Sequence, residues 1–239
     1  MKEQTREEPK IVAAAERQMQ AWVKTAEIQE QTIRDQGAQN VCDQIGKFLT
    51  ISREEGAGGS EIAQLVGEKL GWEVLDKNLL DRVGERLQCS RAMLELVDET
   101  PGNWVLDVLG GWMDKQIVSQ EKYVVHLGRV VLAAARRGNV VLVGRGAQFL
   151  LPREKGLCVR IIAPKKFRAE RIAAGRNLDA AAARKLVDET DLGRREFAQR
   201  FFHHEIDDPH HYDLVINAER IGPDDAADTI AQALARVSV

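Results

Sequence analysis

One stretch, residues 48–70, constrains the fold of this chain more than any other. It reads FLTISREEGAGGSEIAQLVGEKL: an apolar, β-branched run, a glycine-rich turn over 52–59, and then apolar residues at helical spacing. The pattern predicts a strand, a loop and a helix that begins near Ser60. Backbone N–H groups of such a loop converge, and the positive end of the helix dipole points to the same place. The stretch therefore favours the binding of a phosphate group.

The loop departs from the usual ATP-binding consensus, which is G-x-x-x-x-G-K-[ST]. Arg53 stands at the position of the first glycine, Gly59 replaces the lysine, and Ser60 takes the hydroxyl position. A glycine-rich turn between a strand and a helix also occurs in proteins that bind no nucleotide. The motif by itself leaves both interpretations open.

Composition narrows the class of protein. Of the 239 residues, 44% are hydrophobic, so a large core can be buried, and the net charge of −3 gives no basic bias toward nucleic acid. Cys42, Cys89 and Cys158 are far apart, which argues against a disulfide framework and for a reducing compartment. The sequence shows no signal-peptide pattern and no membrane-spanning run. We expect a cytoplasmic protein without nucleic-acid or membrane partners.

Strands and helices alternate through most of the chain. This alternation predicts a three-layer α/β/α fold around a five-stranded, mostly parallel sheet. After the strand that starts at Phe48, further strands are expected at 72–76, 139–143, 157–162 and 212–217, with helices opening at Pro164 and spanning 178–202 and 224–237.

Two helical segments lie outside this alternation. Residues 1–46 carry a thin apolar stripe, which predicts an N-terminal helical extension that docks on the core or on a second copy of itself. A homodimer through this helix is one expectation. Residues 78–137 indicate several helices, and in an α/β nucleotide protein such an insertion often closes over a second substrate. The α/β domain itself is expected to span residues 47–239.

Taken in order, these pieces resemble the cytidylate-kinase-like branch of the P-loop nucleoside monophosphate kinases, over about residues 47–235. The segments that carry the resemblance are Thr50–Ser52 with Gly56–Gly58, Val74–Asp76, Gly144-Arg145, Ala163–Arg171, Asp191-x-x-Arg194 and Leu214–Asn217. A divergent branch of this family has the loop S-R-x-x-G-x-G-G, which residues 52–59 fit. The resemblance implies a P-loop fold, a lid region at about 172–210, and ATP with Mg²⁺. It also implies transfer of a phosphoryl group to a nucleoside monophosphate such as CMP or dCMP, or to a similar small acceptor.

Phosphoryl transfer asks a protein mainly for positioning and for neutralisation of charge, which arginine forks supply well. The expected catalytic residues are Arg53, Arg145, Arg168, Arg171 and Arg194. The expected cofactor-binding residues are Gly56, Ala57, Gly58, Gly59, Ser60 and Glu61, with the Ser60 hydroxyl as the metal ligand. The expected acceptor-binding residues are Asp76, Lys77, Arg82, Arg145, Gly146, Asp191 and Arg194. Either Arg53 or Lys77 is expected to supply the cation that Gly59 lacks.

Plainer interpretations stand beside these. Arg168 and Arg171 also fit a solvated helix face, and Asp76 also fits a helix cap. The histidine-rich run at 203–211 favours a polar loop over a metal site, because it has no established ligand spacing. For the whole protein, the alternatives to an ATP-dependent kinase are a non-catalytic nucleotide sensor with the same fold and a structural oligomer.

Overall fold

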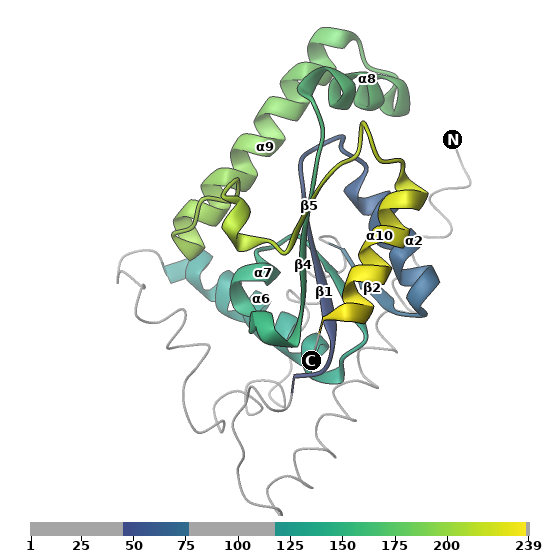
Figure 1. Ribbon diagram of the computed structural model, residues 1–239. Helices are drawn as coiled ribbons and strands as arrows, with labels where there is room; N and C mark the ends of the chain where they lie inside the picture. The colour runs from purple at the N-terminus through teal and green to yellow at the C-terminus, as the bar shows by residue number, and fades with distance from the viewer. Residues whose placement is uncertain (1–44, 77–117, 238–239) are drawn as a thin grey trace, which may run out of the picture. The chain divides into compact units, whose positions relative to one another are not determined.

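A computed structural model of the chain describes residues 45–76 and 118–237 (Figure 1). These residues belong to two units, each of which we describe by itself. One unit contains Ile45 and residues 118–137, and the other contains residues 46–76 and 138–237. The predicted N-terminal extension and most of the predicted insertion, including Lys77 and Arg82, lie outside the described residues.

The larger unit is built on a five-stranded sheet in which every pair of neighbours is parallel, in the order β2-β3-β1-β4-β5. The predicted five-stranded sheet is therefore confirmed. The central strands β1, β3 and β4 are buried on both faces. This explains why their sequences are largely apolar runs, without a strict alternation of apolar and polar residues. The strands are β1 (Phe48–Arg53), β2 (Glu73–Leu75), β3 (Val140–Val143), β4 (Gly156–Ile162) and β5 (Leu214–Asn217).

Helices connect these strands. The long ones are α2 (Gly59–Leu70), α8 (Lys165–Arg176), α9 (Ala180–Phe202) and α10 (Pro223–Arg236), with α6 (Val118–Arg137) in the other unit. Three short elements are α7 (Ala147–Leu150), η2 (Arg153–Lys155) and η3 (Pro209–His211). The helix predicted from residue 178 begins at Ala180 because the Asp179 carboxylate accepts the N–H groups of Ala181 and Ala182 and caps it. None of the helices in the described ranges is long and apolar enough to cross a bilayer.

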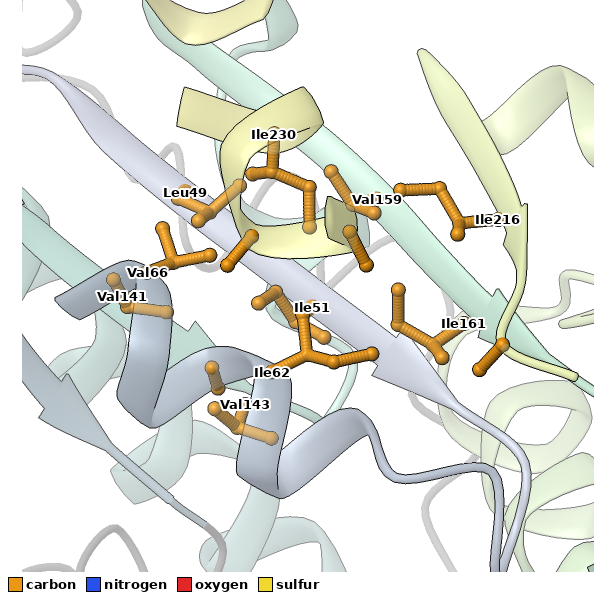
Figure 2. Packing of buried hydrophobic residues seen from close by; sticks show 14 of the residues in the cluster. Leu49, Ile51, Ile62, Val66, Val141, Val143, Val159, Ile161, Ile216 and Ile230 are labelled. Atoms are coloured by element: carbon orange, nitrogen blue, oxygen red, sulfur yellow. The ribbon is translucent and has the colours of Figure 1, made fainter. Parts of the chain in front are cut away.

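The core of the larger unit lies between one face of the sheet and the helices α2 and α10 (Figure 2). Alternate residues of the strands point to this face, so Leu49 and Ile51 of β1 meet Ile62 of α2 and Ile230 of α10. The other core residues labelled in the figure are Val66, Val141, Val143, Val159, Ile161 and Ile216. Packing of α2 onto the strands fixes where its N-terminus lies, at the carboxyl edge of the sheet.

Helices α8 and α9 pack against each other and extend beyond that carboxyl edge (Figure 1). The connection from β4 to α8 places Ala163 next to the loop after β1, where its N–H group donates to Glu54 at 3.0 Å. In an open parallel sheet, ligands bind outside the carboxyl ends of the strands. The loop after β1 and the two helices therefore define the region in which the predicted site residues should meet.

Candidate phosphate-binding site

The loop between β1 and α2 has the backbone that its glycines predict. Gly56 and Gly58 have φ angles of 80° and 84°, in the left-handed region that favours glycine. At Gly56 a Cβ atom would lie 2.6 Å from the Arg168 carbonyl oxygen, so a side chain has no room there. The loop is held close to α8 because these glycines have no side chains.

The N-terminus of α2 is left open to a ligand. Its N-cap is Gly58, which provides no side-chain oxygen. The N–H groups of Gly59, Ser60 and Glu61 find no acceptor among the described residues. Ser60 is exposed in the first turn of this helix. Uncapped donors and the positive helix end together suit an anion.

The Arg53 side chain lies along the position that a longer side chain at residue 59 would need. A Cβ atom on Gly59 would come within 2.5 Å of the Arg53 Cβ, and one on Gly144 within 2.1 Å of Arg53 Nη1. Arg53 therefore starts beside the first residue of α2 and ends against the residue after β3. Its Nε atom is buried and has no hydrogen-bond partner among the described residues. The lack of side chains at both glycines makes the room for this arginine.

Charged groups from four segments surround Arg53. Burial and, after it, the nearby charge of Arg194 lower the pKa of Arg53 to about 10; Arg145 acts in the same direction, whereas Glu55 and Asp76 oppose the change. The structure thus brings three predicted residues, Asp76, Arg145 and Arg194, within electrostatic reach of the Arg53 guanidinium group. A buried cation beside two others is a favourable place for an anion.

Arg145 is held in an unusual conformation. Its φ angle is 56°, and the flanking Gly144 and Gly146 have φ angles of 79° and 70°. The guanidinium carbon lies 5.7 Å from the centre of the Phe197 ring of α9, a cation–π contact. A Cβ atom at Gly146 would lie 2.2 Å from the Phe202 ring, so there is no room for a side chain at this position. Left-handed backbone at a non-glycine residue is typical of functional sites.

Arg168 and Asp191 connect the loop to α8 and α9. Arg168 is 6% exposed, so the interpretation as a solvated face is wrong for this residue. It donates to the carbonyl oxygens of Ala163 at 2.8 Å and Glu55 at 3.0 Å and to the Asp191 carboxylate at 2.5 Å. The other Asp191 oxygen accepts the Glu55 N–H group at 2.8 Å. These bonds give both residues a positioning role in the loop; their predicted contacts with substrates stay predictions.

The Glu55 carboxylate is bridged by two arginines. Arg194 Nη2 donates to Oε2 at 2.6 Å, and Arg176 Nη2 donates to Oε1 at 3.0 Å. Arg194 Nη1 also donates to the Arg53 carbonyl oxygen at 2.9 Å. Arg176, the last residue of α8, was not predicted from the sequence, because only the approach of α8 to the loop makes it a neighbour of the site.

Arg171 reaches the N-terminus of α2. Its Nη2 atom donates to Glu61 at 2.8 Å and would lie 3.3 Å from a Cβ atom on Gly58. The side chain is 40% exposed, so an incoming ligand can reach it. Both residues belong to the predicted site, and the structure places them side by side.

Arg160, in the middle of β4, is a second arginine that the sequence analysis missed. It is 5% exposed and donates to Ser52 Oγ at 3.0 Å, while its other nitrogen pairs with Asp207. Tyr212 joins them, with its hydroxyl 3.3 Å from Ser52 Oγ. A single charged residue inside an otherwise apolar run was the signal that could have identified this buried network.

The histidine-rich run forms an aromatic cluster. Phe149 stacks on His204 at 5.0 Å between ring centres, and His211 lies 4.6 Å from His204. Burial, followed by the nearby His211 and His203, lowers the pKa of His204. Across residues 45–76 and 118–237, no three histidine, cysteine, aspartate or glutamate side chains are grouped so as to hold a metal ion.

Comparison with known proteins identifies the class. The model of the cytidylate kinase-like family matches residues 48–220, and the chain belongs to that family. The resemblance inferred from the motifs is thereby confirmed. The matched residues include the loop after β1, Arg145 and the whole of α8 and α9, which are the segments that form the site.

Individual relatives share about a third or less of their aligned residues with this chain. A cytidylate kinase of Methanocaldococcus jannaschii is 34% identical over 89 residues, which cover 36% of this chain and 50% of that protein. A cytidylate kinase of Halobacterium salinarum is 26% identical over 190 residues, covering 78% of this chain and 88% of that protein. A crystal structure of an uncharacterized protein from Eubacterium ventriosum has 21% identity and a TM-score of 0.61, covering 80% of this chain and 97% of that one. The last similarity shows a shared fold.

Proposed function

We propose that this protein is an ATP-dependent kinase that transfers a phosphoryl group to a nucleoside monophosphate of the CMP or dCMP type, or to a similar small phosphate acceptor. The observation that carries the proposal is that Arg145 and Arg194 lie within electrostatic reach of Arg53, whose side chain begins beside the first residue of α2. Membership of the cytidylate kinase-like family supports it. Its setting is the cytoplasm, as the cysteine pattern suggests.

Each group at the site has a task in this proposal. The N–H groups of Gly59, Ser60 and Glu61 would bind phosphate oxygens of the donor, and Arg171 would add positive charge beside them. The residues fit a magnesium ion at one point, the exposed Ser60 hydroxyl at the start of α2. When bound, the ion would neutralise negative charge on the phosphate groups of the donor.

Arg53 supplies the positive charge that a lysine at position 59 would provide in the usual ATP-binding loop. Its side chain occupies the space beside Gly59, and its charge lies buried between the ends of β1 and β3. A positive charge fixed where negative charge develops stabilises a transition state without reorganisation. Arg145, just after the neighbouring strand β3, would bind the phosphate of the acceptor, and Asp76 would orient the acceptor or these arginines.

The test is an assay of ADP release with ATP, Mg²⁺ and a panel of nucleoside monophosphates, together with calorimetric binding of the same compounds. We expect ADP release that depends on an acceptor, with CMP or dCMP the best. Binding of ATP without turnover for every acceptor would leave a nucleotide sensor, and absence of binding would leave a structural protein. Either result contradicts the kinase proposal.

A further inference from the structure

Glu55 differs from the other acidic residues of the loop, because its carboxylate lies between two arginine side chains. Each of its oxygens receives one guanidinium nitrogen, from Arg176 at 3.0 Å and from Arg194 at 2.6 Å. The Glu55 side chain is 14% exposed, whereas that of Arg176 is 54% exposed. Two forks that converge on neighbouring oxygens are the arrangement by which arginines bind a phosphate group.

We propose that Arg176 and Arg194 form a phosphate subsite for the nucleoside triphosphate and that the Glu55 carboxylate occupies this subsite when no ligand is bound. The inference rests on the proposed function, which it deepens by adding Arg176 to the site. An incoming phosphate group exchanges with the carboxylate, and the two arginines keep an anionic partner throughout.

The neighbouring Glu54 shows why Glu55 is suited to this exchange. Glu54 accepts the Ala163 N–H group at 3.0 Å and lies 3.3 Å from Arg168 Nε, so its carboxylate forms part of the connection between β4 and the loop. Glu55 accepts no backbone N–H group through its carboxylate in the described structure. Only side-chain ion pairs must be replaced when it moves.

The backbone at Glu55 is fixed independently of its side chain. The N–H group donates to Asp191 at 2.8 Å, and the carbonyl oxygen accepts from Arg168 at 3.0 Å. Release of the carboxylate therefore needs a change of rotamer and leaves the path of the loop unchanged. Because Arg176 is half-exposed, a phosphate group can approach it from solvent.

The experiment measures the affinity for ATP with Mg²⁺ by calorimetry in the wild-type protein and in Glu55→Gln, Arg176→Gln and Asp188→Asn. Asp188→Asn is the matched control: it also replaces one carboxylate by an amide, but on α9, where Asp188 forms an exposed ion pair with Lys165 of α8 at 2.6 Å. Adenosine, which has no phosphate, is the ligand control.

We expect Glu55→Gln to bind ATP about three- to tenfold more tightly than Asp188→Asn does, because the competing carboxylate is gone. Arg176→Gln should bind ATP about three- to tenfold more weakly than the wild type. The affinity for adenosine should not change in any variant.

The proposed subsite is refuted if Glu55→Gln binds ATP no more tightly than Asp188→Asn does. This result does not bear on whether the wild-type protein is a kinase. If Glu55→Gln does not fold by circular dichroism, the exposed Arg176→Gln decides, and unchanged ATP affinity in that variant overturns the subsite. A wild-type protein that binds ATP but transfers no phosphoryl group refutes the proposed function and not the subsite. If neither the wild type nor Glu55→Gln binds ATP, both proposals fail.

Discussion

Arg53 is a costly residue to bury. Its guanidinium group lies close to two other arginines, and its Nε atom has no hydrogen-bond partner among the described residues. Burial of a charge without full pairing destabilises a folded protein, and a purely structural residue here would be apolar. We interpret Arg53 as a residue whose charge serves a ligand at the expense of stability.

Replacement of Arg53 by Met should therefore stabilise the ligand-free protein. Because the folded-state pKa, about 10, lies below the ordinary value, the unfolded chain holds the proton more tightly in a pH window that begins near 10. The destabilising contribution is fully present at neutral pH and disappears as the pH rises through that window. Urea unfolding at pH 7 should show a free energy of unfolding higher by about 1–3 kcal/mol, with loss of the stabilisation by ATP.

The control for this variant is Arg195→Met, which removes a half-exposed arginine of α9. It should change the free energy of unfolding by less than about 0.5 kcal/mol and leave the effect of ATP in place. A less stable Arg53→Met protein that still responds to ATP would show that Arg53 is a structural residue.

The proposal that Arg53 replaces the lysine missing from the loop can be tested directly. Gly59→Lys should lower the free energy of unfolding by about 1–3 kcal/mol and abolish kinase activity, because the new Cβ atom meets the Arg53 side chain. The double variant Arg53→Ala, Gly59→Lys should recover stability and part of the activity, since the lysine then has room. Gly193→Lys, at a helical glycine with open space around it, is the control. If the double variant recovers neither stability nor activity, Arg53 does not replace the missing lysine.

At the level of elements, the bonds that connect the loop to the α8–α9 pair include one buried ion pair, Arg168–Asp191. The side chains of Arg168 and Asp191 are 8% and 11% exposed, and both contact the backbone of Glu55. Asp191→Ala should cost about 3 kcal/mol, because it leaves a buried arginine without its partner. Asp188→Ala, at an exposed pair on the same helix, should cost less than about 1 kcal/mol.

Urea unfolding measures these two costs, and amide hydrogen exchange locates the effect. In Asp191→Ala the Glu55 N–H group should exchange faster, because its acceptor is gone. Similar costs for the two variants would mean that the buried pair does not connect the helices to the loop.

The elements were largely predictable from the sequence, whereas the partners of the arginines were not. Parallel strands such as β3 and β4 are buried on both faces, so their apolar runs stand out locally. The roles of Arg160 and Arg176 depend on which segments meet after folding: Arg160 reaches Ser52 on the adjacent strand, and Arg176 reaches Glu55 across the loop. No local pattern contains that information.

The same distinction applies within one predicted pair. Arg168 and Arg171 were expected on one face of a helix, and both approach the segment 54–61. Yet Arg168 is buried and bonded to protein acceptors, while Arg171 is accessible. Spacing along the helix predicts the shared direction, but the depth of each side chain depends on the tertiary contact with the loop.

At the level of the whole molecule, positive charge is concentrated although the chain is acidic overall. The net charge is −3, but arginines from β1, α8, α9 and the segment after β3 gather at the carboxyl edge of the sheet. In the proposed function, such a concentration would attract a dianionic acceptor. The predicted homodimer through the N-terminal extension involves residues outside the described ranges and stays a prediction.

Arg145→Ala should weaken acceptor binding by about 10- to 100-fold while the fold stays intact, because one charge-assisted contact with phosphate is lost. The measurement is the KM for the acceptor, with circular dichroism as the check on folding. Arg200→Ala is the control, because Arg200 makes a similar contact with an aromatic ring, 5.4 Å from the Phe201 ring centre. Equal effects of both variants on the acceptor KM would argue against a specific role for Arg145.

The most direct test is a titration of the ¹⁵N-labelled protein with ATP and Mg²⁺, followed through its amide chemical shifts. The account predicts that the N–H signals of Gly58, Gly59, Ser60 and Glu61 shift most, together with the Arg53 and Arg171 side-chain signals, and that adenosine leaves them in place. Shifts concentrated elsewhere in the chain, or no shifts at millimolar ATP, would contradict phosphate binding at the start of α2.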